Sequence, residues 1–536
     1  MSFRPDPKSI AGTNLPVAER AEVLVIGGGP AGMAAAMQAA SEGRSVILVD
    51  ENPIGLETMA ENLPLHFGSG MTGAVRNRNA MLEAVAGAMP ALEDCLAAGV
   101  DVRLGTACWG IYAPGPDIGW LAGPVAGLMD GARSWMIGAE RIVVAAGQRD
   151  MGLAFPGWEK DGVMGILAAE RLAVFYGALQ PRRLVVLGTG TETLQSALAL
   201  QAAGATILAV VEVGQAPLGA PAMLTALAAK GTRLISGHAP KQAEGGAAVE
   251  ALVLRPVDDD GHGQGGADIR IACDGVLLGV GQVPVVELLD AAGCRMVFDP
   301  ARGGIVPELD ARQGTSKPGI YAAGNCAGIW PAKTLDTAIA RGEGQRAASA
   351  LPGAAGEHSP PDGQVGEDRL AWVRATVLDA GDSLHVCQCE EVTAREILEL
   401  RPPRYLGVDQ LADGLPQSNR RDLRSLLGDH PHPDQVKRLT RAGMGPCQGR
   451  RCREQVAALL ALASDLPYGA IRPASHRAPV RPMPLRLAAL TNVETDAMAR
   501  HWDTWFGMPA QYVPFWSVPA RYTAATRSGD TEGASE

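Results

Sequence analysis

Four cysteines in the second half of the chain have the spacing that most directly suggests chemistry. Cys387 and Cys389 lie two positions apart in HVCQCEEV, and Cys447 and Cys452 follow in GMGPCQGRRC. Four thiolates can ligate zinc tetrahedrally or hold a 2Fe–2S cluster, and spacing alone does not decide between them. Zinc sites favour two to four residues between paired cysteines, so the C-x-C pair favours the cluster. Unligated thiols are the third alternative.

Helices are expected on both sides of these thiols. The run TAREILEL has apolar residues at helical spacing, with Thr393 as its N-cap. Cys447 is expected in a glycine-rich loop and Cys452 at the start of the last helix, where the helix dipole stabilises a thiolate. His430 and His432 are rival ligands, but their Pro-flanked polar setting is more typical of a surface loop.

The strongest pattern in the chain is the segment AEVLVIGGGPAGMAAAMQAASEGRSVILVDEN. A buried strand leads into Gly27, Gly29 and Gly32, and an Ala-rich helix follows. Such glycines permit a tight turn, backbone approach to a pyrophosphate, and close helix–strand packing. The second strand ends at Asp50, followed by Glu51, where a carboxylate accepts a hydrogen bond from a ribose hydroxyl. The segment predicts a dinucleotide-binding Rossmann unit.

Two later stretches indicate which dinucleotide binds. RIVVAAGQRD (141–150) predicts a strand ending at Gly147 and resembles the ATG strand of two-domain flavoproteins. GIYAAGNCAGI (319–329) resembles the carboxy-terminal FAD motif of the glutathione-reductase-like family. In that family a Gly-Asp pair contacts the ribityl chain and phosphate, and here the pair is Gly324–Asn325. The resemblance implies FAD, although Asn lacks the charge of Asp.

A second, weaker Rossmann pattern lies inside the first, in RRLVVLGTGTETLQSALALQAAGATILAVVEV. Gly188 and Gly190 keep the first two glycine positions, and Thr193 occupies the third. Glu212 ends the next strand, at the place of an NAD-type ribose acceptor. A working NAD(P) site and a retained fold without one both fit this pattern.

The other five cysteines are isolated in the sequence, so the chain lacks the C-x4-C pair that disulfide reductases of this fold carry after the first FAD unit, and their C-x-x-C pair in the second domain. We expect packing roles for these five cysteines and no dithiol reductase activity. They are Cys95, Cys108, Cys273, Cys294 and Cys326.

Composition restricts the class of protein. The chain has 536 residues, 47% of them hydrophobic and 20% charged, with a formal net charge of −11. This acidic balance argues against a nucleic-acid partner. We expect no signal peptide and no membrane span, because no apolar run is long enough, and the nine cysteines suggest a reducing compartment, so a cytoplasmic location is expected.

The expected fold class is α/β, with two nested Rossmann-like domains of the glutathione-reductase-like flavoprotein type and a small, mainly helical 2Fe–2S domain. The expected units are an N-terminal arm (1–20), an FAD-binding domain (21–150 and 275–350), an inserted NAD-type Rossmann domain (151–274), a linker (351–382), the cluster domain (383–468) and a C-terminal docking tail (469–536).

The segments CQCEEVTAREI and QVKRLTRAGMGPCQGRRC make the resemblance specific. They resemble the domain related to bacterioferritin-associated ferredoxin that is fused to certain flavoproteins. These are the A-type subunits of opine oxidases, the B subunit of hydrogen cyanide synthase, and the alpha subunit of dye-linked proline and hydroxyproline dehydrogenases. The likeness covers roughly residues 20–485.

This resemblance implies a division of labour. A separate FAD-dependent amine oxidase-like beta subunit, with a small gamma subunit in some assemblies, would oxidise the C–N bond of the amine or amino acid. FMN would lie at the subunit contact, and the present chain would pass electrons through its cluster and FAD toward a respiratory acceptor. No catalytic residue is expected here; His66, the best isolated candidate, is expected to line the core or the flavin.

Two other functions remain open from the sequence. One is a self-contained NAD(P)H-dependent FAD/2Fe–2S reductase, and the other is a scaffold with structural zinc. The aromatic segment RHWDTWFGMPAQYVPFW (500–516) either packs on its own domain or anchors a partner subunit.

Overall fold

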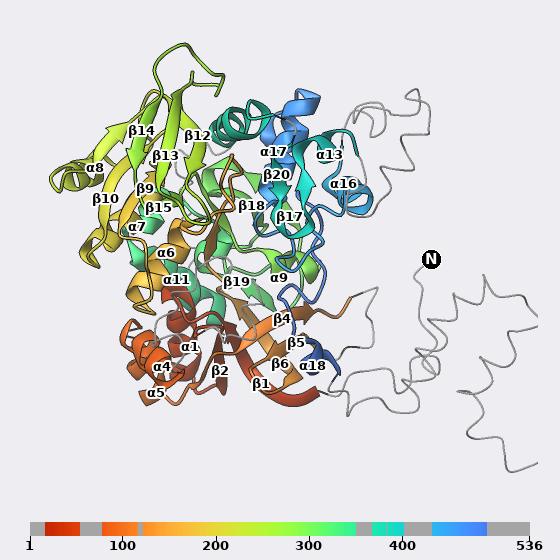
Figure 1. The fold of residues 1–536 in the computed structure, drawn as a ribbon. Helices are drawn as coiled ribbons and strands as arrows, with labels where there is room; N and C mark the ends of the chain where they lie inside the picture. The colour runs from red at the N-terminus through yellow and green to blue at the C-terminus, as the bar shows by residue number, and fades with distance from the viewer. Residues whose placement is uncertain are drawn as a thin grey trace, which may run out of the picture.

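A computed structural model of the chain describes residues 17–53, 78–89, 91–115, 121, 123–349, 367–381, 383–400 and 431–489. No helix in these ranges is both long and apolar enough to cross a membrane. Figure 1 shows a lower sheet coloured red to orange, a second sheet at the upper left in yellow to green, and a helical module at the upper right in blue.

The lower sheet is built around the amino-terminal strand. β1 (Val17–Ile26) pairs in parallel with β2 (Val46–Asp50) and with β6 (Ser134–Val144). The sheet order is β3-β2-β1-β6-β5-β4, and β19 (Ile320–Ala322) pairs with β6. The other members are β3 (Asp101–Leu104), β4 (Ala107–Tyr112) and β5 (Val125–Met129).

Burial on both faces explains the continuous apolar run of β1. Val23, Leu24 and Val25 are fully buried, as is typical of central parallel strands covered on both sides. Helix α1 (Pro30–Ser41) packs against α11 (Thr337–Ala348), which returns from the far end of this unit. The same unit contains α4 (Arg78–Gly87) and α5 (Leu92–Ala97).

The second sheet is wholly parallel, with the order β11-β10-β9-β15-β8. Its strands are β8 (Val163–Gly165), β9 (Arg183–Leu187), β10 (Thr206–Val211), β11 (Arg233–Ile235) and β15 (Gly275–Leu278). Its helices are α6 (Ile166–Val174), α7 (Thr191–Ala202) and α8 (Pro221–Ala228). We call the lower sheet with its helices the first unit, and the parallel sheet with its helices the second unit. Because β15 pairs with β9 and β8, this strand belongs to the second unit, and the chain returns to the first unit only after it.

An antiparallel sheet and several short elements complete the two units. The sheet consists of β12 (His238–Glu244), β13 (Ala251–Pro256) and β14 (Ile269–Ala272). The two crossings between the units pair with each other as β7 (Gln148–Asp150) and β16 (Gln282–Pro284). The short elements that follow are α9 (Glu287–Ala291), β17 (Met296–Asp299), β18 (Gly304–Pro307) and α10 (Pro331–Leu335).

The described residues between 383 and 468 form the cysteine module, which lies against the second unit (Figure 1). A two-strand hairpin of β20 (His385–Cys387) and β21 (Val392–Thr393) carries the first pair of thiols. Its helices are α13 (Ala394–Leu398), α16 (Pro433–Thr440) and α17 (Arg453–Ser464). The capping box of Thr393 and Glu396 confirms the predicted start of α13, and Cys452 is the N-cap of α17, as predicted.

Part of the stretch expected to be a linker (351–382) is helical and packed in the structure. Residues 367–378 form α12 (Glu367–Val373) and a π-helical turn (Arg374–Leu378), and Trp372 is only 1% exposed. The apolar spacing of RLAWVRATVL explains why this stretch packs instead of remaining extended.

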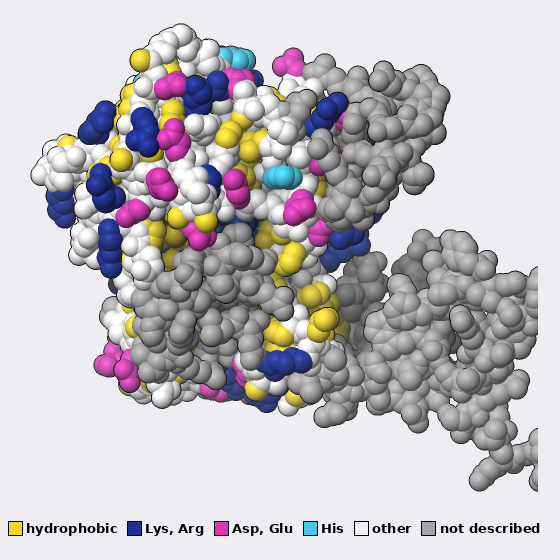
Figure 2. All heavy atoms as spheres, in the orientation of Figure 1, with side chains coloured by type: hydrophobic (Ala, Val, Ile, Leu, Met, Phe, Trp, Pro, Cys, Tyr) yellow, Lys and Arg dark blue, Asp and Glu magenta, His cyan; other side chains and the backbone are white. Residues whose placement is uncertain are grey.

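A continuous apolar core joins the second unit to the cysteine module. Phe155 and Trp158 from one side share it with Trp372, Val386 and Leu459 from the other. On the face shown in Figure 2, acidic and basic side chains are interspersed over the described surface without a broad patch of one sign.

Candidate flavin and cysteine sites

In the first glycine loop, two of the three positions in the motif, Gly27 and Gly32, can be occupied only by glycine. Gly27 has a φ of +108°, and a Cβ there would lie 2.3 Å from the carbonyl oxygen of Ala145. A Cβ on Gly32 would lie 1.8 Å from the carbonyl oxygen of Gly27. Gly29, the N-cap of α1, has nothing within 4 Å of its Cβ position. The open space at the helix start therefore fits a pyrophosphate, as predicted.

Asp50 lies beside this loop at the end of β2. Its Oδ2 accepts a hydrogen bond from the backbone N–H of Gly28 at 2.6 Å, and its Oδ1 accepts one from the backbone N–H of Asn52 at 2.8 Å. These bonds hold the carboxylate beside the glycine loop, and its contact with a ribose stays a prediction.

A segment from the far end of the chain reaches the same place. Arg481 forms an ion pair with Glu51, and burial lowers the pKa of Arg481 to about 10, while the charge of Asp50 opposes this shift. The segment is held by Val480, whose N–H donates to the carbonyl of Trp109 at 2.8 Å and whose carbonyl accepts from Arg450. Glu51 is therefore paired with a residue that follows the cysteine module.

The loop carrying Gly324 and Asn325 is held by a fully buried ion pair. Lys333 Nζ lies 2.7 Å from Glu343 Oε2, and both side chains are 0% exposed. Lys333 also donates to the carbonyls of Gly324 at 2.8 Å and Gly328 at 2.9 Å, while Glu343 accepts from the N–H of Gly324 at 2.8 Å. Burial lowers the pKa of Lys333, and the adjacent Glu343 opposes that effect.

This loop lies against the start of α1. A Cβ on Gly324 would be 2.9 Å from the Cβ of Ala31, and Gly324 has a φ of +74°. Asn325 donates through Nδ2 to Gln148 Oε1 at 2.9 Å, and Gln148 follows Gly147, which has a φ of +75°. The structure therefore brings the three predicted flavin motifs together, and this arrangement fits FAD.

The second glycine loop is arranged differently. Gly188 requires glycine, because its φ is +98° and a Cβ would lie 2.1 Å from the carbonyl oxygen of Gly279. Thr193, in place of the third glycine, donates to that same carbonyl at 2.6 Å. Gly190 is the N-cap of α7, but Glu192 lies in the first turn. A carboxylate at this helix start disfavours a pyrophosphate.

Glu212 follows β10, and its side chain points into the protein. It is 1% exposed, and it accepts from the N–H and hydroxyl of Thr189 at 3.0 and 2.5 Å and from the N–H of Val213 at 3.0 Å. Burial raises the pKa of Glu212 to about 7, and the hydrogen bonds from Thr189 oppose this shift. These hydrogen bonds already use the carboxylate of Glu212, which the sequence predicted would bind a ribose.

The four predicted cysteines come together from segments far apart in the chain. The Sγ atoms of Cys387 and Cys389 are 4.0 Å apart, and those of Cys389 and Cys447 are 3.7 Å apart. Cys387 also interacts with the Cys452 thiol. The neighbouring thiol of Cys387 raises the pKa of Cys389 to about 11, and burial adds to the effect. The Cys389 thiol is therefore protonated at neutral pH unless a metal displaces the proton.

These Sγ–Sγ distances can be compared with the distance expected between two thiolates on one metal ion. Two thiolates on one tetrahedral metal, at about 2.3 Å each, lie roughly 3.8 Å apart. The N–H of Gly443 points at Cys387 Sγ at 3.4 Å, and a Cβ on Gly445 would lie 2.5 Å from Cys389 Sγ. Within the described ranges, however, no group of three or more His, Cys, Asp or Glu side chains is arranged to hold a metal ion. Four thiols are nevertheless the donor set of a thiolate-ligated centre, and none of them forms a disulfide.

The cysteine module shares an apolar core with the second unit, and it also contacts the flavin unit through ion pairs and hydrogen bonds. Arg149 in β7 forms ion pairs with Glu287 and Glu454, and it donates to the carbonyl of Arg450 at 2.9 Å. Further on, the indole of Trp158 donates to the carbonyl of His385 at 3.0 Å. Gln148, which holds Asn325, thus immediately precedes a residue bonded to the loop between Cys447 and Cys452.

The remaining predicted residues divide into three groups. Cys95, Cys108, Cys273, Cys294 and Cys326 are all buried, and burial raises the pKa of each thiol. His432 caps α16 by accepting from the N–H of Asp434 at 3.1 Å. His66, His430 and the aromatic segment 500–516 lie outside the described residues.

Sequence reasoning missed Arg149, Lys333 and Arg481. Each is a lone basic residue in a loop or short element, and its acidic partner is not its neighbour in sequence. No spacing in the proline-rich stretch after the cysteine module indicates that Arg481 pairs with Glu51.

Residues 21–350 match the family model described as pyridine nucleotide-disulphide oxidoreductase. This match covers more than half of the chain, which therefore belongs to that family. The protein is an oxidoreductase with an α/β, FAD-binding type of fold.

Curated relatives extend the likeness beyond the family model. The chain is 26% identical over 510 residues to the A-type subunit of opine oxidase from Agrobacterium tumefaciens (strain Ach5), covering 89% of this chain and 93% of that one. It is 26% identical over 495 residues to hydrogen cyanide synthase subunit HcnB from Pseudomonas protegens, covering 86% of this chain and 96% of that one.

A solved structure resembles the fold over the same span. L-Proline dehydrogenase from P. horikoshii superposes with a TM-score of 0.55 at 18% identity, covering 88% of this chain and 80% of that chain. At this identity the likeness concerns the fold alone.

Proposed function

We propose that this protein is the FAD-containing electron-transfer subunit of a multi-subunit dehydrogenase acting on an amine or amino acid of the opine, proline or hydroxyproline kind. An amine oxidase-like beta subunit would oxidise the substrate, with FMN at the subunit contact. Cys387, Cys389, Cys447 and Cys452 would hold a 2Fe–2S cluster that exchanges electrons with the FAD and a respiratory acceptor.

The observation that carries this proposal is the direct bonding between the flavin motif and the cysteine loop. Asn325 binds Gln148, and the adjacent Arg149 binds both Glu454 and the carbonyl of Arg450. A flavin accepts two electrons together and can release them singly, and a 2Fe–2S cluster carries one. A module held rigidly beside the flavin would supply that one-electron connection.

The residues of the chain would act by binding and positioning. The open start of α1 would receive the pyrophosphate, Asp50 the ribose, and the loop held by Lys333 the ribityl chain and phosphate of the FAD. The buried contacts around Arg149 would keep water out of the contact between the two sites. Names of the relatives support the amine or amino-acid substrate class and the need for partner subunits.

Cofactor analysis of the purified chain tests the proposal. We expect iron and acid-labile sulfide together with FAD, and a rhombic electron paramagnetic resonance signal after reduction. Cys389→Ser should lose the iron and sulfide while keeping the flavin, whereas Cys273→Ser, at an isolated buried cysteine outside the flavin motifs, should keep both. Stoichiometric zinc without labile sulfide would contradict the cluster and leave a structural centre.

The rival function is a self-contained NAD(P)H-dependent reductase. Glu192 at the start of α7 and the internal bonding of Glu212 argue against it, because both weaken a nicotinamide dinucleotide site. Anaerobic addition of NADH separates the two functions. Rapid bleaching of the flavin by NADH would support the reductase, and slow or absent bleaching, with fast reduction through a co-expressed amine-oxidising partner, would support the electron-transfer role.

A further inference from the structure

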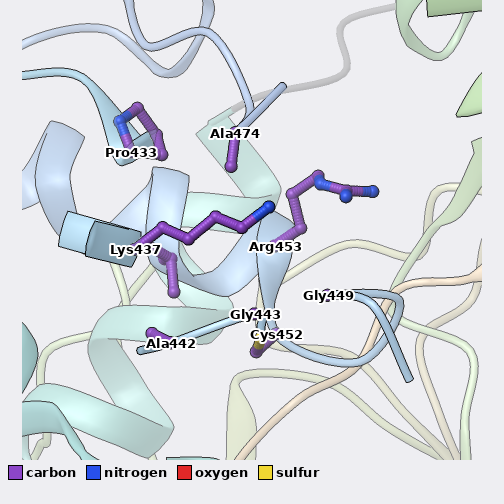
Figure 3. Close-up of a pocket in the computed structure, with 9 residues that line it drawn as sticks. Pro433, Lys437, Ala442, Gly443, Gly449, Cys452, Arg453 and Ala474 are labelled. Atoms are coloured by element: carbon purple, nitrogen blue, oxygen red, sulfur yellow. The ribbon is translucent and has the colours of Figure 1, made fainter. Parts of the chain in front are cut away.

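A small cavity lies between α16 and α17, on the side of the cysteine loop that holds Cys452. Its volume is about 10 Å³, and its wall includes Lys437, Gly443, Gly449, Cys452 and Arg453. Figure 3 shows the long side chains of Lys437 and Arg453 extending into the same region from the two helices. Two cations therefore face one cavity.

Arg453 is buried without a full set of hydrogen-bond acceptors. Its relative exposure is 5%, and its Nη2 donates to the carbonyl of Gln448 at 3.1 Å. Its Nε and Nη1 are buried, and neither has a partner among the described residues. Buried polar groups are nearly always paired, and an unpaired charged donor is costly, so these two N–H groups call for an acceptor.

Lys437 also lacks a counter-ion in the described part of the chain. The nearby carboxylate of Asp434 instead accepts from the N–H and the hydroxyl of Ser475, at 3.0 and 2.6 Å. Burial lowers the pKa of Lys437, and the like charge of Arg453 lowers it further. The charge of Arg477 also lowers the pKa of Lys437, whereas the charge of Asp434 raises it.

The backbone adds to the positive potential. The cavity lies at the N-terminus of α17, a 12-residue helix whose N-cap, Cys452, makes no side-chain capping bond. The N-terminal end of such a helix attracts negative charge. Glu454, in the first turn, hydrogen-bonds to Arg149 and does not line the cavity, although its charge also acts on Arg453.

We propose that this cavity is a binding site for a small inorganic anion, held by an unpartnered N–H of Arg453 and by Nζ of Lys437. The volume is near that of one water-sized sphere, so a larger ion requires side chains of the wall to move. The flexible stem of Lys437 can withdraw to admit a tetrahedral oxyanion. Cys452 lies in the wall of the cavity, but the two cations proposed to hold the anion are not cysteine ligands, so anion binding can be measured separately from the iron and sulfide content.

Calorimetric titration of the full-length protein tests the site, with chloride and inorganic phosphate as separate probes at constant ionic strength. We expect saturable binding of at least one of them. Lys437→Gln should weaken that binding about tenfold, since a charge-assisted hydrogen bond contributes roughly 1.5–3 kcal/mol. Saturable binding of chloride would identify a site for a monatomic ion, and saturable binding of phosphate would identify a site for a tetrahedral ion.

Arg438→Gln is the matched control, because Arg438 is an exposed cation on the same helix that does not line the cavity. Binding in this variant should equal that of the unmodified protein. Arg453→Met should abolish binding; if that variant does not fold, the comparison of Lys437→Gln with Arg438→Gln decides alone. Absence of saturable binding of both ions, or equal weakening in both variants, would overturn the proposal.

Discussion

Arg149 and Glu454 form a two-pronged ion pair across 305 positions of sequence, with N–O distances of 3.1 and 2.5 Å. One partner follows the flavin-associated Gly147, and the other follows Cys452. Burial tends to raise the pKa of Glu454, but the charge of Arg149 outweighs it and leaves the pKa below its usual value. The pair therefore fixes the cysteine module to the flavin unit.

Removing Arg149 should destabilise the protein strongly. Arg149→Met leaves Glu287 and Glu454 buried without their cation, which typically costs about 3–5 kcal/mol. Denaturant unfolding measures the loss. Arg295→Met breaks the exposed pair with Glu308, where the side chains are 68% and 49% exposed, and should cost less than about 1 kcal/mol. Equal losses in the two variants would show that burial of the Arg149 pair is unimportant.

A methyl group at Gly445 should disturb the thiols selectively. Gly445→Ala places a Cβ 2.5 Å from Cys389 Sγ, so the sulfur must move. We expect lower iron and sulfide content with unchanged FAD content. Gly246→Ala, where nothing lies within 4 Å of the new Cβ, should leave all three unchanged. Full metal content in Gly445→Ala would mean that Cys389 is not a ligand.

The Lys333–Glu343 pair should control flavin retention. Lys333→Met leaves a buried carboxylate unpaired and frees the carbonyl of Gly324, so we expect loss of FAD and about 3–5 kcal/mol of stability. The double variant Lys333→Met/Glu343→Gln removes both charges and should recover part of the stability. Absorbance of the bound flavin and thermal unfolding measure the two effects, and normal FAD content in Lys333→Met would contradict the role given to the loop.

Glu212 should give the stability a pH dependence of defined sign. Burial raises its pKa from 4.5 to about 7, so between these values the folded protein binds a proton that the unfolded chain has released. The contribution of Glu212 is therefore greatest below pH 4.5 and falls as pH rises to about 7, by roughly 1.4 kcal/mol per pH unit. Glu212→Gln should flatten this slope in denaturation experiments across that pH range, and identical slopes would contradict the assignment.

Local signals in the sequence predicted the parts of the site that depend on local backbone geometry. Gly27 and Gly32 are required by contacts within and beside one strand–turn–helix unit, and Thr393 caps a helix that begins at the next residue. Pairings between distant segments were beyond such signals. Glu212 illustrates the difference: its position at a strand end was predicted, but its capture by Thr189 depends on the side chain of a loop residue between two glycines.

The contact of Arg481 with Glu51 has a consequence for the order of assembly. Glu51 belongs to the first strand–helix–strand unit to leave the ribosome, whereas Arg481 lies beyond the cysteine module. In the proposed flavin site, the end that carries Glu51 would therefore stay incomplete until nearly all of the chain has been synthesised. Flavin insertion should consequently be a late, post-translational event that reports on whether the cysteine module has already docked.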